Sequence, residues 1–331
     1  MRETEKIKVL AIIPGEEEGP VMIFAKRQAA SVERAGVPQF VYYLKSRLSP
    51  LKLYKSYREV KELIRRFKPD LIHVHYGTVT SFFSLFFGLP VIISFQGSDI
   101  NRTPGDGLLR DFFGRLLSNI SAVFVRKIIC VSQGLIHSVW WAQKKCVLIP
   151  SGINTDLFKP EDKKTCRQTL GWKEDEFIIL FNGRDPVVKR QDIAESAVKL
   201  ASSKTQKPIR LEVLSGMIDA GTIPTLINAS SCILMCSDNE GSPMVVKEAL
   251  SCNIPVVTTV VGDAADRVKG VEGCFIVDQD AAVIANVLTA MAEAGTDPRT
   301  NGRPKLIADG LSEESVCEKL IGIYREVVGL N

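Results

Sequence analysis

Short runs of almost entirely apolar residues alternate with helical patterns along the whole chain. The runs occupy residues 7–13, 39–44, 70–77, 90–97, 128–131, 177–183, 210–216, 232–236 and 254–259. A strand that is apolar along its whole length is buried on both faces, which is typical of a parallel sheet covered by helices on each side. The chain is therefore predicted to be an α/β protein with doubly wound parallel sheets.

The alternation of strands and helices occurs twice, which indicates two domains. A chain of 331 residues with 45% hydrophobic residues is long enough to fill two cores. Residues 128–131 are the last main strand of the first series, and the segment around residues 151–160 leads into the second. We predict a first domain over residues 1–158 and a second over residues 159–331.

Three loops of the first domain are candidate ligand sites, because ligands of open parallel sheets bind beyond the carboxyl ends of the strands. We expect these loops to line one cleft. Backbone N–H groups at Gly15 and Gly19 could approach a phosphate, although three glutamates between them count against a dedicated phosphate cradle. The other candidates in these loops are His75, Gln96, Ser98 and Asp99.

The stretch DNEGSPMVVKEAL, from Asp238 to Leu250, is predicted to pass from a loop into a helix. Ser242 is expected to be the N-cap and Pro243 the first helical residue, where a missing N–H costs nothing. The N–H groups of Met244 and Val245 then lack partners within the helix and point outward, which favours a bound phosphate.

Two carboxylates flank this helix start. Glu240 precedes it, next to Gly241, and Glu248 lies four positions after Met244 and so on the same face of the helix. A phosphate on the helix start, with a carboxylate for sugar hydroxyls on each side, is what a nucleotide-sugar would need. The alternative is a surface helix with two solvated glutamates.

The pair Glu240 and Glu248, with seven residues between them, GSP inside and KEALSCNIPVV after, resembles the donor site of the family 4 glycosyltransferases. The segments GPVMIFAKRQ, PDLIHVHYG, SFQGSDINR, IICVSQGL and LIPSGINTDLFKP resemble the first domain of that family. The resemblance covers nearly the whole chain. It implies the GT-B architecture, in which two Rossmann-like domains face across a cleft, and a last helix, about 312–328, that crosses back to the first domain.

The resemblance also implies a retaining, metal-independent transfer of a hexose from a nucleoside diphosphate sugar to a hydroxyl. Arg184 and Lys189 match the residues that hold the donor diphosphate, and two cations would offset the charge of the leaving group; the alternative is a loop with ordinary surface cations. Glu240 would hold sugar hydroxyls and Glu248 the ribose. UDP is favoured over GDP or ADP, and no separate cofactor and no metal are expected. The acceptor side is assigned to His75, Ser98 and Asp99.

Two features depart from the family pattern. Only a few residues separate Gly216, a candidate donor contact, from Ile223, where longer members carry an additional helix and strand that form part of the nucleobase pocket. This resembles a short branch that acts in bacterial surface-polysaccharide assembly. Gln96 stands where the family usually has a His that touches the transferred sugar. A Gln can donate and accept hydrogen bonds but cannot carry a proton.

The net charge of +4 hides an asymmetry between the halves. Residues 1–150 hold 22 Lys or Arg against 12 Asp or Glu, and the remainder holds 20 against 26, which leaves +10 and −6. Ten of the basic residues fall between Arg34 and Lys68, several on a predicted amphipathic helix after Pro50. This helix could rest on an anionic membrane, or it could be a solvated helix face. No nucleic-acid signature accompanies the charge.

Compartment signals favour the cytoplasm, either free or at the inner face of the cell membrane. The N-terminal MRETEKIKVL lacks the apolar core of a signal peptide, and the apolar region from Val79 to Phe95 is interrupted by GLP. Eight cysteines without a CxxC pattern suit small buried residues better than disulfides or a zinc site. The acceptor is expected to be a glycan or a lipid-linked glycan.

Other chemistries are less well supported. His73 and His75 share a strand face, but a third metal ligand is not apparent, and Asp278 and Asp280 are interpreted as a helix N-terminal region. The alternatives that stay open are a nucleotide-sugar epimerase of the same architecture and a catalytically weak partner protein that binds nucleotide-sugar. A two-domain solute-binding protein would also fit the alternation, but it would need an export signal.

Overall fold

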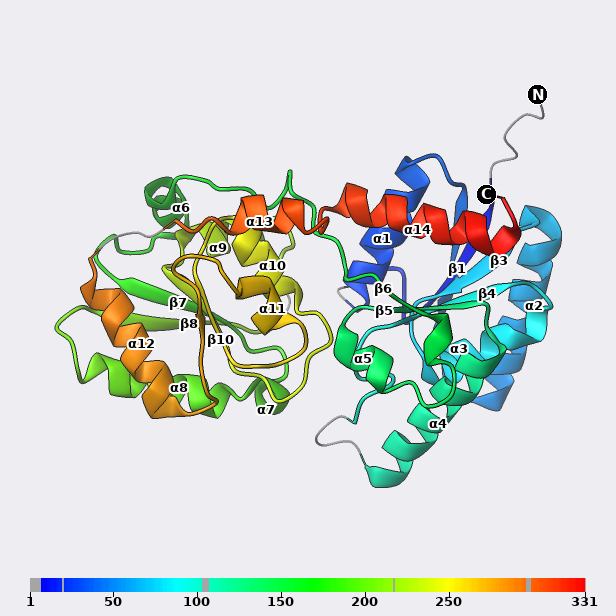
Figure 1. Ribbon diagram of the computed structural model, residues 1–331, viewed down its shortest axis with the longest axis horizontal. Helices are drawn as coiled ribbons and strands as arrows, with labels where there is room; N and C mark the ends of the chain where they lie inside the picture. The colour runs from blue at the N-terminus through cyan, green and yellow to red at the C-terminus, as the bar shows by residue number, and fades with distance from the viewer. Residues whose placement is uncertain (1–6, 20, 103–106, 217, 296–298, 331) are drawn as a thin grey trace. The chain divides into compact units, whose positions relative to one another are not determined.

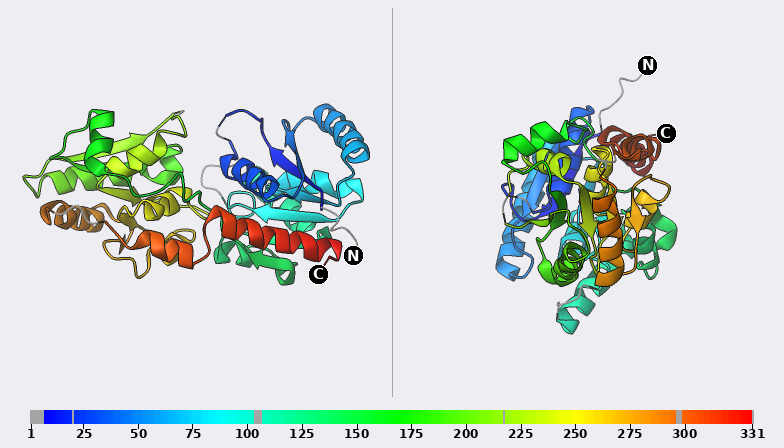
Figure 2. Two further views of the ribbon diagram at one scale, coloured as in Figure 1. Left: turned by 90° about the horizontal axis from the view of Figure 1, so that it is seen from above. Right: turned by 90° about the vertical axis from the view of Figure 1, so that its left-hand side faces the viewer.

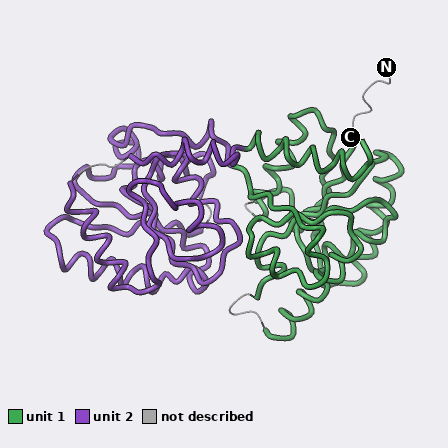
Figure 3. Tube along the Cα trace, viewed as in Figure 1, with its two compact units in different colours: residues 1–152, 313–331 green, residues 153–312 purple. Residues whose placement is uncertain are grey.

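The computed structural model describes residues 7–19, 21–102, 107–216, 218–295 and 299–330. The chain divides into two compact units, coloured separately in Figure 3. Unit 1 comprises Met1–Gly152 and Glu313–Asn331, and unit 2 comprises Ile153–Ser312. Each unit contains a parallel sheet with helices on its faces (Figure 1), which confirms the fold class predicted from the apolar runs.

The sheet of unit 1 has the strand order β2-β1-β3-β4-β5-β6, and all neighbouring strands are parallel. Its strands are β1 (Val9–Pro14), β2 (Gln39–Leu44), β3 (Leu71–Val74), β4 (Val91–Phe95), β5 (Lys127–Cys130) and β6 (Cys146–Leu148). Its helices are α1 (Ile23–Arg34), α2 (Pro50–Phe67), α3 (Thr78–Ser84), α4 (Leu108–Phe124), α5 (Gln133–His137) and α14 (Glu313–Val328), with short 3-10 turns at Leu85–Phe87 and Gln143–Lys145.

Both faces of this sheet are buried, which explains why its strands are apolar at every position. Leu10 and Ile12 of β1 belong to the core on one face, whereas Val9 belongs to the core on the other. Helix α14, from the end of the chain, contributes Leu320 and Tyr324 to the second of these cores. It lies beside α1 in Figure 1.

The units divide earlier than the predicted boundary near residue 158. The segment that follows Gly152 is part of unit 2, because Ile153 and Phe158 are fully buried in a core of that unit. The last helix belongs to unit 1, so unit 1 is built from two separate stretches of the chain. In the described part of the chain, no helix is long and apolar enough to span a bilayer.

The sheet of unit 2 has the order β11-β10-β9-β7-β8, again with parallel neighbours. Its strands are β7 (Phe177–Asn182), β8 (Ile209–Leu214), β9 (Cys232–Met235), β10 (Val256–Thr258) and β11 (Phe275–Ile276). Its helices are α6 (Lys163–Leu170), α7 (Pro186–Lys189), α8 (Gln191–Ser202), α9 (Ile223–Ala229), α10 (Met244–Ser251), α11 (Ala264–Val268), α12 (Ala281–Glu293) and α13 (Gly302–Ala308).

Helices α8 and α12 pack against each other over one face of this sheet (Figures 1 and 2). Small residues of α8, such as Ala194 and Ala197, are fully buried and allow this close approach. Asp280 caps α12 by accepting hydrogen bonds from the N–H groups of Ala282 and Val283 at 2.9 and 3.0 Å. The interpretation of this acidic segment as a helix start is therefore confirmed.

Candidate functional site

The loop between β9 and α10 holds the first predicted carboxylate. Residues 236–243 form it, and α10 begins at Met244. The prediction that Ser242 is the N-cap is wrong by one residue: Pro243 is the cap, with an extended backbone and no side-chain bond to the helix. The Ser242 hydroxyl is used elsewhere, because it donates to Asp263 Oδ2 at 2.8 Å. Met244 and Val245 still form the first turn, whose N–H groups have no partners within the helix.

Lys189 and Glu240, predicted from separate stretches, meet in unit 2. Lys189 is the last residue of α7, and its Nζ forms an ion pair with Glu240 Oε1. The two side chains are only 18% and 13% exposed. Ser237 Oγ donates to the same carboxylate oxygen at 2.9 Å. The predicted cation and the predicted carboxylate therefore belong to one constellation at the carboxyl ends of β7 and β9.

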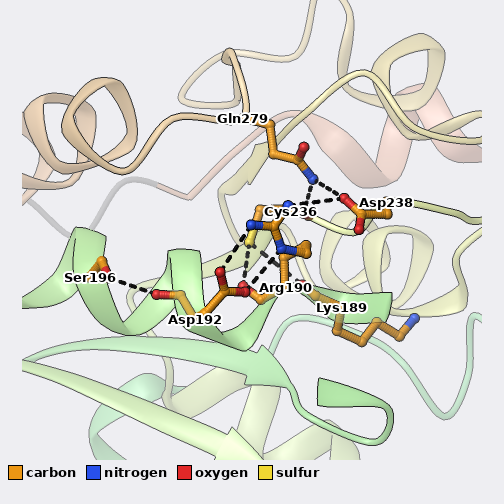
Figure 4. A network of polar contacts seen from close by, with 7 residues as sticks. All are labelled: Lys189, Arg190, Asp192, Ser196, Cys236, Asp238 and Gln279. Carbon is orange, nitrogen blue, oxygen red and sulfur yellow. Dashed lines mark hydrogen bonds and ion pairs between the residues drawn. The ribbon is translucent and has the colours of Figure 1, made fainter. Parts of the chain in front are cut away.

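A second polar network fixes this loop against α7 and α8 (Figure 4). Arg190 donates to both carboxylate oxygens of Asp192, at 3.0 and 2.9 Å, and to Asp238 Oδ1 at 3.3 Å. Gln279 Nε2 donates to the carbonyl of Cys236 and to Asp238 Oδ1, both at 2.8 Å. The hydrogen bond from Arg190 lowers the pKa of Asp192. Neither Arg190 nor Asp238 could be assigned this role from the sequence, because a charged loop residue does not reveal its partner.

The loop after β10 supports Glu240 from another direction. Gly262 has φ +55°, and a Cβ built on it would lie 2.7 Å from the carbonyl oxygen of Gly241 and 3.1 Å from Glu240 Cβ. No side chain fits there unless the Glu240 loop moves. The only sequence signal was a glycine in the loop that follows β10 (Val256–Thr258), at the edge of the sheet where ligand loops are expected.

Lys247 lies inside unit 2 behind the start of α10. Its side chain is 0% exposed, and Nζ donates to Ser242 Oγ at 2.9 Å. Ser242 in turn donates to Asp263, whose Oδ2 also accepts from Arg267 Nε at 3.1 Å. Burial lowers the pKa of Lys247 to about 8, with Asp263 opposing that shift. This chain of contacts, also missed from the sequence, joins α10 to the start of α11.

The other donor-side residues of unit 2 differ in exposure, and Gly241 and Pro243 are buried. Met244 and Glu248 are both half-buried, whereas Val246 and Lys247 between them are buried, so the first two share the partly exposed face of α10. Arg184 is exposed.

Arg184 and Gly216 occupy loops at adjacent strand ends. Arg184 follows β7, and its backbone N–H donates to Asn182 Oδ1 at 3.3 Å. Gly216 follows β8 with φ +74°. Because β9, β7 and β8 are neighbours in the sheet, the loops with Glu240, Arg184 and Gly216 lie along one edge of it.

In unit 1, Asp99 is an internal anchor rather than an acceptor contact. It is 0% exposed, and its carboxylate accepts hydrogen bonds from the N–H groups of Gly77 at 2.8 Å, Gln96 at 3.0 Å and Gly97 at 2.9 Å. Burial raises its pKa, and the backbone donors partly offset that effect. The prediction that Asp99 faces an acceptor is therefore wrong, because both of its oxygens join the loops after β3 and β4. Gln96 itself is half-buried.

His75 is also corrected. Its side chain is 1% exposed and packs on His73, with ring centroids 4.0 Å apart. His73 is held by Tyr324 of α14 and by Ser94, each at 2.7 Å. Burial lowers the pKa of His75 to about 3, so the ring is neutral. A buried neutral imidazole packs within the sheet rather than bordering an acceptor.

The other predicted residues of unit 1 have mixed outcomes. Ser98 is exposed, and its Oγ shares a hydrogen bond of 2.9 Å with Tyr76. Gly15 and Gly19 both have positive φ, at +112° and +86°. The N–H of Gly15 donates to Leu44 O at 3.1 Å, so it is not free for a phosphate. Within the described ranges, no three His, Cys, Asp or Glu side chains gather as ligands for a metal ion.

Comparisons with known proteins agree with this architecture. The model of Glycosyltransferase Family 4 matches residues 17–157, and that of Glycosyl transferases group 1 matches residues 194–293. The putative teichuronic acid biosynthesis glycosyltransferase TuaC of Bacillus subtilis is 25% identical over 289 residues, which covers 77% of this chain and 71% of the relative.

Solved structures resemble the chain over almost its full length. Sucrose-phosphate synthase from Thermosynechococcus elongatus has a TM-score of 0.81 at 19% identity and covers 98% of this chain and 100% of its own. Anabaena Alr3699/HepE in complex with UDP and glucose has a TM-score of 0.74 at 17% identity, with coverages of 97% and 100%. With glycosyltransferase models matched in order along both units, the chain belongs to the family 4 glycosyltransferases of the GT-B fold.

Proposed function

We propose that this glycosyltransferase moves a sugar from a nucleoside diphosphate sugar to an acceptor hydroxyl, with retention at the anomeric carbon and without a metal ion. The observation that carries the proposal is the Lys189–Glu240 ion pair beside the first turn of α10. Cation, carboxylate and free backbone N–H groups lie together there, and a sugar diphosphate requires all three.

Lys189, Arg184 and the first turn of α10 are proposed to bind the diphosphate. An ammonium group has three donors, so Lys189 can keep its contact with Glu240 while it donates to a phosphate oxygen. Arg184 is exposed and can approach the same group. The N–H groups of Met244 and Val245 complete the anion site. These fixed charges replace the role that a divalent cation has in other transferases.

Glu240 is proposed to hold the sugar hydroxyls and Glu248 the ribose. In the transfer, the acceptor oxygen forms a bond to the anomeric carbon on the face from which the diphosphate leaves. The carbon–oxygen bond to the diphosphate breaks, and the acceptor proton passes to the leaving phosphate oxygen. Gln96 is proposed to hydrogen-bond the transferred sugar.

The nucleotide and the acceptor are narrower proposals. UDP is favoured, because a structure of similar fold was determined with UDP and glucose. The relative TuaC is described as a teichuronic acid biosynthesis glycosyltransferase. This favours a glycan or lipid-linked acceptor in cell-surface polysaccharide or glycolipid assembly.

A thermal-shift comparison of UDP, GDP and ADP tests the donor site. A ligand present at 100 times its Kd stabilises the fold by about 2.7 kcal/mol, so UDP should raise the Tm clearly. Lys189→Met should remove most of that shift, whereas Lys199→Met, on the exposed end of α8, should retain it. If no nucleotide changes the Tm of the native protein, the proposal fails.

NMR of the reaction mixture separates transfer from the alternative of epimerisation. An epimerase would convert UDP-sugar to a second UDP-sugar without an acceptor. The proposed transferase should release UDP only when an acceptor is present, give a product linkage of the donor's configuration, and keep its rate in EDTA. An inverted linkage would contradict the proposed mechanism.

A further inference from the structure

Lys247 is a fully buried cation that the proposed transfer does not use. It is 0% exposed, although the four-carbon side chain of a lysine usually carries its ammonium to the surface. Burial lowers the pKa of Lys247 to about 8, which still leaves the ammonium charged at pH 7. Taking a charge out of water costs free energy, so a charge at this position is a candidate for a functional role.

The ammonium is also directed toward the end of its helix where a cation is least stable. Helix α10 begins at Met244, and Lys247 Nζ reaches back to Ser242 Oγ, two residues before the helix, at 2.9 Å. The first turn of a helix carries a partial positive charge, which attracts anions and repels cations. Lys247 therefore adds to the positive field at the start of α10, and a bound anion would relieve the repulsion.

The neighbouring charges compensate this ammonium only in part. Asp263 is 3% exposed, and its Oδ2 accepts from Ser242 Oγ at 2.8 Å and from Arg267 Nε at 3.1 Å. Asp263 and Glu248 favour the charged form of Lys247, whereas burial and Arg267 disfavour it, and the net result is a pKa below that of a lysine in water. The protein thus stabilises the ammonium less well than water does, and an added anion would improve the balance.

Ser242 links the buried ammonium to the proposed diphosphate site. It is half-buried, and it lies directly before the turn that presents the N–H groups of Met244 and Val245. A hydroxyl has one hydrogen to donate and two lone pairs. Its oxygen can continue to accept from Lys247 while its hydrogen turns from Asp263 to a phosphate oxygen. A hydroxyl that accepts from an ammonium is polarised and becomes a stronger donor.

We propose that Lys247 stabilises the bound donor diphosphate indirectly, by donating to Ser242, which donates in turn to a phosphate oxygen. Lys247 is a positioning residue in this arrangement, because it acts through the hydroxyl and does not touch the donor. A buried charge is screened less by salt than an exposed one, so it can strengthen phosphate binding from behind the helix start. The inference rests on the proposed function and adds a buried cation to the diphosphate site.

Ligand-observed NMR titrations with UDP and with uridine test the inference, because uridine lacks the phosphates. In Lys247→Met and in Ser242→Ala, we expect the Kd for UDP to rise about tenfold, the effect of losing a hydrogen bond to a charged group. The Kd for uridine should not change. The double variant should lose no more affinity than either single variant, because the two side chains act as a unit.

Two further variants serve as controls. Ser242→Thr keeps the hydroxyl and should retain the native Kd for UDP. Lys199→Met removes an exposed cation from α8 and should also leave both Kd values unchanged.

Several results would overturn the inference. One is a native Kd for UDP in Lys247→Met. A native Kd for UDP in Ser242→Ala, which leaves the buried charges in place, refutes it equally, even if Lys247→Met does not fold. An equal loss of UDP and uridine affinity would mean that Lys247 only supports the fold of the loop. Multiplied losses in the double variant would mean that the two side chains act separately. A native protein that binds no UDP would instead refute the proposed function together with this extension of it.

Discussion

The Lys189 ammonium and the Glu240 carboxylate lie in a part of unit 2 where water has little access. Removing either charge leaves the other poorly solvated, and a buried charge without a partner is costly. A neutral, isosteric substitution is therefore more informative than Ala, because it removes the charge and keeps hydrogen bonding and volume. The same kind of substitution suits Glu248, which is also half-buried.

Glu240→Gln and Glu248→Gln are expected to have different kinetic effects. If Glu240 holds the sugar in the transition state, Glu240→Gln should lower kcat by about 10- to 100-fold, the range for a hydrogen bond to a charged group. Glu248→Gln should instead raise the Kd for UDP, measured by calorimetry, about tenfold. Glu293→Gln, at the exposed end of α12, serves as the control. Turnover at the wild-type rate in Glu240→Gln would exclude this role.

Lys247 gives a prediction about pH. The pKa of Lys247 is about 8 in the folded protein and about 10.5 when exposed. Between pH 8 and pH 10.5 the unfolded chain therefore holds one more proton than the native protein. Raising the pH from 8 to 10.5 should therefore stabilise the native protein by up to roughly 3 kcal/mol relative to Lys247→Met, which lacks this group. Urea unfolding at several pH values measures the difference. Parallel stability curves for the two proteins would contradict the prediction.

At the level of elements, the loops at the carboxyl ends of β7, β9 and β10 support one another. The loop after β9 carries Glu240, α7 supplies Lys189, and the loop after β10 approaches the Glu240 loop through Gly262. A glycine is required at position 262 for two reasons. Its φ is positive, and an added Cβ would lie too close to the carbonyl oxygen of Gly241. These two effects can be separated, because Gly270 has a similar φ of +76° but no atom within 4 Å of an added Cβ.

Gly262→Ala and Gly270→Ala should therefore lose similar stability but differ in their affinity for UDP. Both place a side chain in the left-handed region, which costs about 1–2 kcal/mol of unfolding free energy. Only Gly262→Ala should also displace the Glu240 loop, and we expect it to weaken UDP binding at least tenfold in a titration. If both variants bind UDP as the native protein does, the loop after β10 does not position the donor site.

The elements themselves were largely predictable from the sequence, but their contacts were not. Continuous apolar strands such as β1 and β9 are visible in the sequence because both faces of each sheet are buried. The burial of Asp99 was not visible, because Gly77, one of its partners, lies on another loop. The burial of His75 was not visible, because its neighbour His73 is held by Tyr324 of α14, which is distant in sequence. The start of α10 was misplaced by one residue, since Ser242 bonds to Asp263 instead of to the helix.

At the scale of the whole molecule, unit 1 is completed by helix α14, which follows all of unit 2 in the sequence. Residues of α14 fill the core on one face of the first sheet, and Tyr324 hydrogen-bonds His73 of β3. The chain of unit 2 lies between the two stretches of unit 1. This arrangement was implied by the family resemblance, whereas the apolar pattern of the helix shows only that one of its faces is buried.

A core substitution in α14 should therefore destabilise strands β1 and β3, which are about 310 and 250 residues away in sequence, while it spares unit 2. Leu320 is 0% exposed in the core that contains Val9 and Leu71, and Leu320→Ala should lower the stability of unit 1 by about 2–5 kcal/mol. Leu288→Ala, equally buried in α12, is the matched control in unit 2.

Hydrogen exchange should rise in β1 and β3 for Leu320→Ala and in β7 and β9 for Leu288→Ala. UDP should slow exchange in unit 2 of the first variant, because Lys189, Arg184 and Glu248, which are proposed to bind the nucleotide, lie in that unit. Faster exchange in β7 and β9 of Leu320→Ala would show that the two cores unfold as one.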